Sequence, residues 1–355
     1  AQQESIAHYA TADDAPAADA TWIETQWTIA RSIAREQGRA ILVLDEIQKA
    51  AQWSSAIKPL VDQDRRHGVD VRALVLGSAA LLIDEGLNES LAGRFERIWM
   101  GHWSWPEMHD EFGMDFDDYV RFGGYPGAAK LRNDADRWAA FVRDAIIETT
   151  IGRDVLQTAR VEKPALLRSV FELACAYSSR ELSYQKMVGQ LQDAGNTTTI
   201  ANYLELLHRA GLVRGLQKFA GQKVRQRGSS PKLLALDTGL VSALASPRMP
   251  SRDADPAAWG FLVETCVGAA LADAQSRLGL ELYYWRQGPD EVDFVVRSAD
   301  RVLAIEVKSG RPHKSTRGME AFRAFQPDAK TLLVGPGGIP LETFLGADIR
   351  TWIEN

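Results

Sequence analysis

The sequence predicts an α/β protein in which two α/β segments flank a mostly helical middle. Short continuous apolar runs, AILVL at Ala40–Leu44 and RALVL at Arg72–Leu76, alternate with helical patterns near the start of the chain. Such runs are typical of parallel strands that are covered on both faces. The α/β pattern returns after Pro256. The length of 355 residues is enough for two or three domains.

The first segment is expected to alternate helix and strand. Its predicted elements are a helix at Trp22–Gln37, the strand Ala40–Leu44, a helix at Trp53–Arg65, the strand Arg72–Leu76 and a helix near Ile83–Ala92. From about Trp105 to Arg160 the pattern becomes mostly helical. We therefore expect an α/β core followed by a helical layer.

Two acids follow the first of these strands directly. In ILVLDEIQKA, Asp45 and Glu46 come after AILVL, which is the Walker B arrangement. There the aspartate holds Mg²⁺ and the glutamate polarises the water that attacks the γ-phosphate of ATP. The carboxyl ends of parallel strands are also where ligands bind in α/β sheets. An apolar strand followed by Asp-Glu also arises by chance.

Two further side chains suit a nucleotide site. Ser78 follows the next strand in LGSAALL and is expected beside Asp45 at the same sheet edge, unless it only forms a turn. Arg94, in SLAGRFERI, is a candidate to stabilise phosphate charge, with an ordinary surface arginine as the alternative.

A phosphate-cradling loop of the form GxxxxGK[ST] is absent from the sequence. In P-loop folds this loop follows the first, central strand, and a sheet without that strand has two unpaired edges. The chain also does not start with Met. We expect the loop to precede Ala1 in the natural protein; otherwise the chain is a degenerate ATPase.

Basic charge is concentrated in the middle of an acidic chain. From Lys163 to Lys232, eleven Lys or Arg and four acids give a balance of +7, so the rest of the chain carries −13 of the total of −6. From Leu206 to Leu236 there are seven basic residues and no acid. This indicates a local site for a polyanion.

The same region has the pattern of a winged helix. Ser183 is predicted to cap a short helix and either Asn196 or Thr197 to cap the next one, and the strands Leu212–Phe219 and Leu233–Leu236 enclose a basic loop. In helix-turn-helix proteins the second helix enters the major groove and a wing meets the backbone. The candidate phosphate contacts are Lys223, Arg225, Arg227 and Lys232. The alternative is a lid or docking module that does not touch DNA.

The last segment contains a compact set of acids. A helix is predicted at Ala258–Ala274, followed by strands near Leu282–Trp285, Val292–Val296, Leu303–Val307 and Thr331–Val334. In EVDFVVRSADRVLAIEVKSG, Asp293 and Glu306 fall on neighbouring strands of a hairpin and share a face with Lys308. With Glu264 as a further acid, this set predicts a Mg²⁺ site. A hairpin with surface acids and a salt bridge is the alternative.

Composition excludes several classes of protein. No apolar run reaches the ~18 residues of a membrane-spanning helix, and the start of the chain lacks the features of a secretory signal. Cys175 and Cys266 lie in apolar contexts, where buried free thiols are expected. We expect a cytoplasmic protein without a membrane partner.

The ordered motifs resemble a prokaryotic family. LVLDEIQK, LGSAALL, SLAGRFE, FGGYPGAA, SSPKLLALDTGL, WGFLVE and EVDFVV…IEVKSG are similar to those of AAA-type ATPases whose C-terminal domain of unknown function is related to the PD-(D/E)XK restriction-endonuclease fold. FGGYPG (Phe122–Gly127) is a landmark of that family with no evident chemistry; its glycines and proline indicate a tight turn.

The resemblance implies four parts. They are a partial AAA-type core lacking its first strand and P-loop (1–104), a helical lid (105–161), a winged helix (162–245) and a PD-(D/E)XK nuclease-like domain (246–355). It also implies Asp45 and Glu46 as the Walker B pair, Ser78 as a sensor and Arg94 as an arginine finger. AAA-type cores often form rings, so a homo-oligomer is expected.

Three hypotheses follow. The leading one is an Mg²⁺-dependent ATPase, active in full-length form, whose nucleotide state controls a DNA-facing winged helix and nuclease-like domain. The second is a metal-dependent DNA nuclease with a regulatory or vestigial ATPase part. The third is a non-enzymatic module that binds DNA or protein.

Overall fold

The computed structural model describes residues 6–15, 17–77, 91–156, 161–220, 229–310 and 317–354. The chain divides into two compact units, residues 1–97 and residues 98–355. Each unit has its own core.

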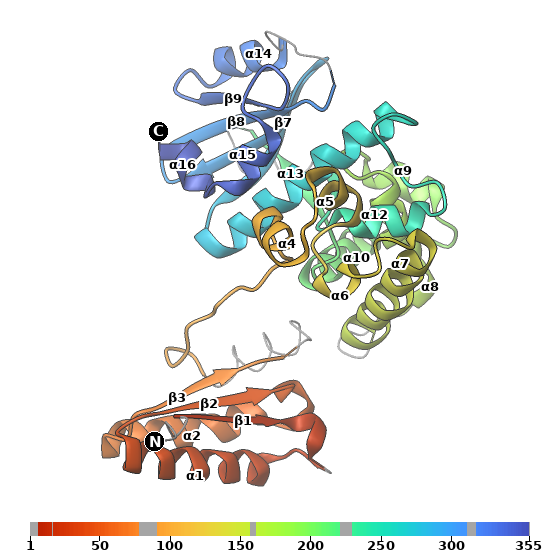
Figure 1. The fold of residues 1–355 in the computed structure, drawn as a ribbon. Helices are drawn as coiled ribbons and strands as arrows, with labels where there is room; N and C mark the ends of the chain where they lie inside the picture. Colours follow the sequence, from red (N-terminus) through yellow and green to blue (C-terminus); the bar gives the residue numbers. More distant parts are fainter. Residues whose placement is uncertain are drawn as a thin grey trace. The chain divides into compact units, whose positions relative to one another are not determined.

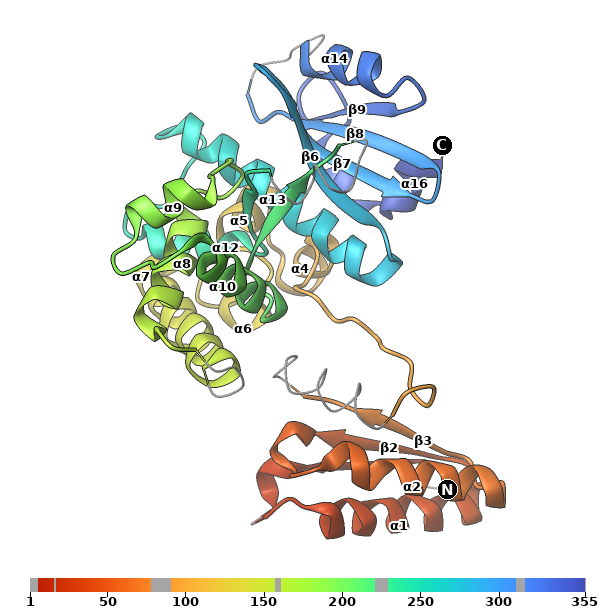
Figure 2. The same cartoon turned by 180° about the vertical axis from the view of Figure 1, so that it is seen from behind.

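The first unit is a three-stranded parallel sheet with helices on one face. Its strands are β1 (Ala7–Thr11), β2 (Ala40–Asp45) and β3 (Val71–Val75), with β2 in the middle. Helices α1 (Ala20–Gln37) and α2 (Trp53–His67) lie along the same face of the sheet (Figure 1, Figure 2). These elements confirm the predicted strands and helices up to β3. The sequence did not predict β1, and the helix expected near Ile83–Ala92 lies almost entirely outside the described residues.

Local sequence explains why α1 begins, ends and packs where it does. The Asp19 carboxylate accepts a hydrogen bond from the Trp22 N–H at 2.9 Å, and Gly38 ends the helix with φ +82°. On the buried face, the Trp27 indole N–H donates to the Asp64 carboxylate of α2 at 2.6 Å, and Arg31 pairs with the same carboxylate. A buried polar network thus ties α1 to α2.

The opposite face of this sheet has apolar side chains in register. Tyr9, Val43 and Leu74 are adjacent across the three strands. Tyr9 is 59% exposed and Leu74 45% exposed. Parallel sheets are normally covered on both faces, so this exposed apolar row is unusual.

The second unit is built on one six-stranded sheet. Its order is β5-β4-β6-β7-β8-β9. The strands are β4 (Val213–Lys218), β5 (Lys232–Ala235), β6 (Glu281–Gln287), β7 (Asp290–Ser298), β8 (Arg301–Val307) and β9 (Lys330–Val334).

The pairing in this sheet joins two segments that the sequence suggested were separate. β4 and β5 form an antiparallel hairpin, and β4 also pairs in parallel with β6 through Gln217↔Tyr283 and Lys218↔Tyr284. β6, β7 and β8 form an antiparallel meander, and β9 runs parallel to β8. The hairpin expected as a wing therefore belongs to the same sheet as the C-terminal strands.

Helices surround this sheet in an order that follows the chain. The helices before β4 are α4 (Trp105–Phe112), α5 (Phe116–Phe122), α6 (Pro126–Ala129), α7 (Ala135–Phe141), the π-helical segments Val142–Ile147 and Thr150–Val155, α8 (Pro164–Ala176), α9 (Tyr184–Gln190) and α10 (Thr197–Arg209). The later helices are α12 (Thr238–Ala245), α13 (Pro256–Leu278), α14 (Arg317–Phe325), α15 (Leu341–Gly346) and α16 (Ile349–Glu354).

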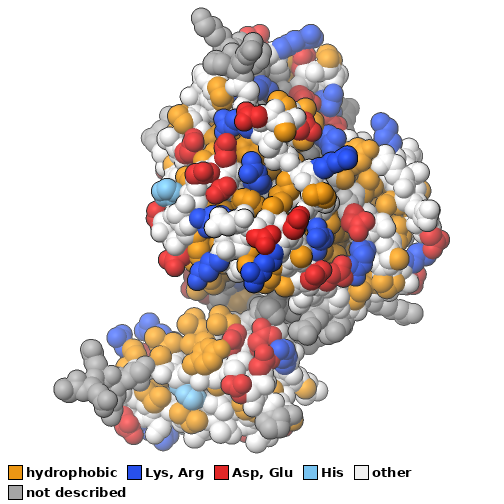
Figure 3. Space-filling view, turned by 45° about the vertical axis from the view of Figure 1, so that its right-hand side comes forward, with side chains coloured by type: hydrophobic (Ala, Val, Ile, Leu, Met, Phe, Trp, Pro, Cys, Tyr) orange, Lys and Arg blue, Asp and Glu red, His pale blue; other side chains and the backbone are white. Residues whose placement is uncertain are grey.

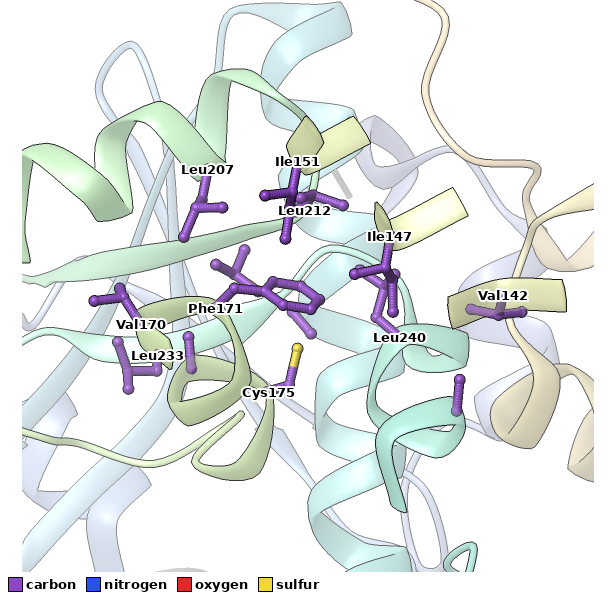
Figure 4. Packing of buried hydrophobic residues seen from close by; sticks show 14 of the residues in the cluster. Val142, Ile147, Ile151, Val170, Phe171, Cys175, Leu207, Leu212, Leu233 and Leu240 are labelled. Carbon is purple, nitrogen blue, oxygen red and sulfur yellow. The ribbon is translucent and has the colours of Figure 1, made fainter. Parts of the chain in front are cut away.

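The largest core of the second unit lies among its helices. Phe171 of α8 is fully buried and packs with Leu207 of α10, Leu212 and Leu240 of α12 (Figure 4). Cys175 belongs to the same core and is a buried free thiol, as predicted. The helices of the middle segment thus share one core with α10 and the β4–β5 hairpin.

The FGGYPG landmark has a packing role. Gly123 has φ +74°, and a Cβ there would lie 1.9 Å from the Asp237 Oδ1 atom. The buried Asp237 carboxylate accepts hydrogen bonds from the backbone N–H groups of Gly124 and Gly239, each at 2.7 Å. Only glycine fits at Gly123, because it needs both the left-handed backbone and the missing side chain.

Helix α13 is the one helix in the described part of the chain that is long and apolar enough to span a membrane. More than half of its most apolar window, 56%, is buried inside the protein. Val263, Cys266 and Val267 of α13 pack in the second core of this unit. This is the pattern of a core helix.

Candidate functional site

The first candidate site lies at the carboxyl end of β2. Asp45 is the last residue of this strand and pairs in register with Thr11, the last residue of β1. The Tyr9 hydroxyl donates to Asp45 Oδ2 at 2.6 Å, and the backbone N–H of Glu46 donates to Asp45 Oδ1 at 3.0 Å. Hydrogen bonding to Asp45 is the main reason why the pKa of Tyr9 is raised. The carboxylate of Asp45 is therefore held in a fixed orientation at the sheet edge.

Glu46 adopts an unusual backbone conformation beside Asp45. Its φ of +52° is in the left-handed region, which non-glycine residues seldom occupy outside turns and functional sites. Its carboxylate accepts a hydrogen bond from the Gln48 amide at 2.9 Å and lies 3.1 Å from the Lys49 ammonium. Lys49 also pairs with Asp13, and hydrogen bonds to Asp13 and then Glu46 raise the pKa of Lys49. Both of these contacts are made to the same oxygen of Glu46, Oε2.

Ser78 and Arg94 are the other two residues that the sequence predicted for a nucleotide site. Ser78 lies outside the described residues. Arg94 forms an ion pair with Asp62 of α2, with nitrogen–oxygen distances of 2.8 and 3.1 Å. This pairing lowers the pKa of Asp62 and raises that of Arg94. Arg94 has to exchange this carboxylate for a phosphate if it acts as a finger.

The second candidate site is a cluster of charges around β7 and β8. The structure brings Asp293, Glu306 and Lys308 together, and the two acids are only 6% and 5% exposed. Lys308 Nζ donates to Glu306 Oε1 at 2.7 Å. The backbone N–H of Val307 donates to Asp293 Oδ2 at 2.8 Å. The adjacent pair Phe294↔Ile305 fixes the register that places both acids side by side.

Two further side chains complete the cluster. Glu264 of α13 forms an ion pair with Lys232 of β5, and Lys232 Nζ lies 3.6 Å from Asp293 Oδ1. We refer to Lys232, Glu264, Asp293, Glu306 and Lys308 as the acid–lysine cluster. It contains three carboxylates and two ammonium groups.

Lys232 was predicted from the sequence to contact phosphates from an exposed wing, and its position in the structure shows that this prediction was wrong. Lys232 is 7% exposed, and its ammonium group is held by acids of the C-terminal segment. All four residues of β5 are buried, so the basic residue at its start is buried with them. The one feature of the sequence that indicated burial of Lys232 is its place directly before the apolar run LLAL.

Burial changes the protonation of the acids. It raises the pKa of Glu264 to about 8, with the nearby Asp293 charge adding to the effect. Burial followed by Asp293 also raises the pKa of Glu306 to about 7. For Lys232 and Lys308 burial lowers the pKa, but the carboxylates outweigh it, and both pKa values are raised. The cluster favours charged lysines and partly protonated glutamates near neutral pH.

The cluster does not fit a divalent ion in this arrangement. Among the described residues, no group of three or more His, Cys, Asp or Glu side chains is placed to hold a metal. Lys232 lies against one carboxylate oxygen of each of Glu264 and Asp293, where a metal would bind. Two buried oxygens of the cluster, Glu264 Oε1 and Glu306 Oε2, have no hydrogen-bond partner in the described structure, and Glu264 Oε1 is the one that contacts Lys232.

The candidate DNA-binding elements are present in part. Ser183 caps α9 through the Lys186 N–H at 3.2 Å, as predicted, and of the two candidates for α10 it is Asn196 that caps the helix, through the Thr199 N–H at 2.9 Å. Lys223, Arg225 and Arg227 lie outside the described residues.

Fewer basic side chains are exposed in this region than the sequence suggested. Arg214 is half-buried and donates to Gln275 of α13 at 2.9 Å, and Lys232 is buried in the acid–lysine cluster. Two of the seven basic residues between Leu206 and Leu236 therefore face the interior. Acidic and basic side chains are also interspersed over the face of the second unit seen in Figure 3.

Comparisons with known proteins match three parts of the chain. Residues 2–109 match the family described as an AAA domain, residues 113–251 match a domain of unknown function (DUF8612), and residues 259–344 match another domain of unknown function (DUF4143). None of these matches covers half of the chain.

The curated relatives are themselves uncharacterised. Proteins from Mycobacterium tuberculosis and Mycobacterium bovis are each 29% identical over 306 residues, which cover 84% of this chain and 65% of the relative. A protein from Haemophilus influenzae is 22% identical over 297 residues, covering 79% of this chain and 69% of that protein. The chain thus spans about two thirds of the length of the relatives it matches.

A solved structure, that of protein VC1899 from Vibrio cholerae, aligns with a TM-score of 0.22 and 14% identity over 89% of this chain and 91% of that one. This likeness is too low to support an argument. The AAA domain at the N-terminus, together with the DUF4143 match at the C-terminus, supports an AAA-type ATPase family for this chain.

Proposed function

We propose that the first unit supplies the acidic half of an AAA-type ATP-hydrolysing site. The observation that carries the proposal is that Asp45 and Glu46 end the middle strand of a parallel sheet, within the segment that matches an AAA domain. Ligands bind at this edge of α/β sheets.

The residues present suit one part of the chemistry. When bound, Mg·ATP supplies the phosphoanhydride and the cation that neutralises its charge. Asp45, oriented by Tyr9 and the Glu46 N–H, has the carboxylate to hold Mg²⁺ through water. Glu46, which contacts Lys49 through Oε2, has the carboxylate that would orient the attacking water. The sequence has no GxxxxGK[ST] loop, so the activity is proposed for a form that also contains a phosphate-binding loop.

Calorimetry of Mg·ATP binding tests this directly. This chain is compared with a version extended upstream to include a phosphate-binding loop, and only the extended form is expected to bind. In that form Asp45→Asn and Glu46→Gln are expected to abolish hydrolysis, because each removes a charge at the reacting end of the nucleotide.

The matched control is Asp70→Asn, an exposed acid of the same unit that pairs with Arg72. Its turnover is expected to equal that of the unchanged protein. Full turnover in both Asp45→Asn and Glu46→Gln contradicts the proposal, as does the absence of binding by the extended form.

We further propose that α9, α10 and the β4–β5 hairpin form a winged helix that faces DNA. The capped helix pair followed by an antiparallel hairpin supports this fold. Neutralising Lys223, Arg225 and Arg227 together is expected to flatten the dependence of DNA affinity on salt by about 2 to 3 in slope. An unchanged slope excludes these residues as the contact.

The C-terminal segment supports a restriction-endonuclease-like fold by its order of elements. Helix α13 precedes the β6–β7–β8 meander, and α14 precedes the parallel strand β9. Asp293, Glu306 and Lys308 lie together on this sheet. We propose the relation in fold alone and not DNA cleavage, because lysines occupy the acids that a catalytic metal needs.

A further inference from the structure

The backbone of Lys232 is fixed on both sides. In β5 it pairs with Leu216 of β4, and on its other side it forms a bridge with Glu181. The neighbouring hydrogen bonds Leu182 N–H to Pro231 O, at 3.1 Å, and Leu233 N–H to Arg180 O, at 2.9 Å, continue this pairing. Lys232 is therefore not on a free loop that can swing away.

The Lys232 ammonium group is surrounded by partners. It pairs with the Glu264 carboxylate, lies 3.6 Å from Asp293 Oδ1 and donates to the Asp293 carbonyl oxygen at 3.3 Å. It also lies 5.1 Å from the centre of the Phe294 ring, within range of a cation–π interaction. The contact with the Asp293 carbonyl is a hydrogen bond and those with the two carboxylates are ion pairs, so the ammonium group lies between two acids.

Lys232 is thus located where a cation is needed. Asp293 is buried and the Glu264 side chain is only 14% exposed, so two carboxylates lie close together in a largely water-excluded place. A divalent ion would bind through the same oxygens that Lys232 contacts. We propose that Lys232 is the built-in counter-cation of the acid–lysine cluster and that it excludes divalent ions from Glu264 and Asp293. This inference does not depend on the proposed ATPase function.

Lys308 provides a matched comparison within the same cluster. Its side chain is 32% exposed, whereas that of Lys232 is 9% exposed, and it bonds to Glu306 alone among the three acids. Removing Lys308 leaves Glu264 and Asp293 still paired with Lys232. Removing Lys232 leaves those two acids without a cation between them.

Titration calorimetry of the full chain with MnCl₂ tests the proposal. Lys232→Met keeps the length of the side chain and removes its charge. Lys232→Met is expected to bind one more Mn²⁺ per chain than the unchanged protein, with affinity at least tenfold tighter than any binding by the unchanged protein at this cluster. The extra site is expected to disappear in the double variant Lys232→Met/Asp293→Asn, and Lys308→Met is expected not to gain it.

Two outcomes overturn the proposal. One is an unchanged protein that already binds Mn²⁺ as tightly as Lys232→Met, with the binding lost in Asp293→Asn. The other is no gain of Mn²⁺ in Lys232→Met, because Lys232 is then not what excludes the ion.

A second measurement covers the case in which Lys232→Met does not fold. The double variant Lys232→Met/Asp293→Asn removes one charge of each sign, and it is compared with both parents by thermal melting in EDTA. It is expected to melt above Lys232→Met, because a counter-cation is needed less once one acid is neutral. A double variant that melts no higher than Lys232→Met overturns the counter-cation role.

Discussion

Replacing Asp237 by alanine tests the packing account of the FGGYPG landmark. The Asp237 carboxylate is 4% exposed and joins two segments far apart in sequence through the N–H groups of Gly124 and Gly239. It also caps α12, because the Gly239 hydrogen bond lies at the start of that helix. Asp237→Ala leaves both buried donors without an acceptor.

The magnitude follows from the two lost hydrogen bonds. An orphaned buried donor costs roughly 1–3 kcal/mol, so two cost roughly 2–6 kcal/mol. Burial raises the pKa of Asp237 despite the nearby His102 and the two N–H groups, so the buried charge itself carries a cost that alanine removes. Subtracting roughly 1–2 kcal/mol for that cost leaves, from the midpoints of the two ranges, a net loss of about 2.5 kcal/mol.

Calorimetric melting of the full chain measures this loss. For a unit of the size of residues 98–355, each kcal/mol shifts Tm by roughly 2–4 °C, so Asp237→Ala is expected to lower its transition by about 5–10 °C. Hydrogen exchange of the peptides containing Gly124 and Gly239 shows whether the loss is local. Both amides are expected to exchange faster in the variant.

Asp255→Ala is the matched control. Asp255 caps α13 through the Ala258 N–H at 3.0 Å, but it is exposed, so water replaces it and the loss is expected to be about 1 kcal/mol. If Asp237→Ala melts within 2 °C of Asp255→Ala, or if exchange at Gly124 is unchanged, the two hydrogen bonds do not hold the landmark together.

Two further predictions concern other buried charges. Asp64→Ala is expected to destabilise the first unit by about 3–5 kcal/mol, because it leaves the Trp27 indole N–H and the Arg31 guanidinium without their shared acceptor; urea unfolding followed by tryptophan fluorescence measures it. In the second unit, the folded pKa values of Glu264 and Glu306, about 8 and about 7, exceed the ordinary value of 4.5, so the folded chain binds more protons between these limits. Stability is therefore expected to fall as pH rises from about 4.5 to about 8, and Glu306→Gln is expected to flatten the part below about 7 in melts at successive pH values.

Exposed acids serve as controls for both. Asp70→Asn in the first unit and Glu342→Gln in the second are expected to change stability by less than about 0.5 kcal/mol. An Asp64→Ala variant as stable as Asp70→Asn contradicts the first prediction. A Glu306→Gln variant whose melting temperature follows pH as steeply as that of Glu342→Gln contradicts the second.

The sequence predicted local features well because their causes are local. AILVL and RALVL are continuous apolar runs, and both are strands of a parallel sheet. Asp293 and Glu306 could be placed together because a short turn between β7 and β8 fixes their register. By contrast, the sequence did not predict β1. Its five residues, AHYAT, show no clear alternation of apolar and polar side chains, and their burial in the structure is also mixed.

Features that depend on distant segments could not be predicted in this way. Lys232 is buried because Glu264 and Asp293, 32 and 61 residues later in the chain, neutralise its charge. Without those partners, a lysine in an acid-free stretch is correctly expected at the surface. The parallel pairing of β4 with β6 has no local signature either, because it joins strands more than 60 residues apart.

That pairing sets limits on how the C-terminal segment can be used as a module. A fragment starting at the boundary of the DUF4143 match, near residue 259, would lose β4 and leave β6 paired with β7 on one side only, which exposes an edge that favours aggregation. It would also lose Lys232 and leave Glu264 and Asp293 buried without their cation. If this segment is inserted into another protein, exchanged or truncated, we therefore expect it to fold only when it includes the β4–β5 hairpin.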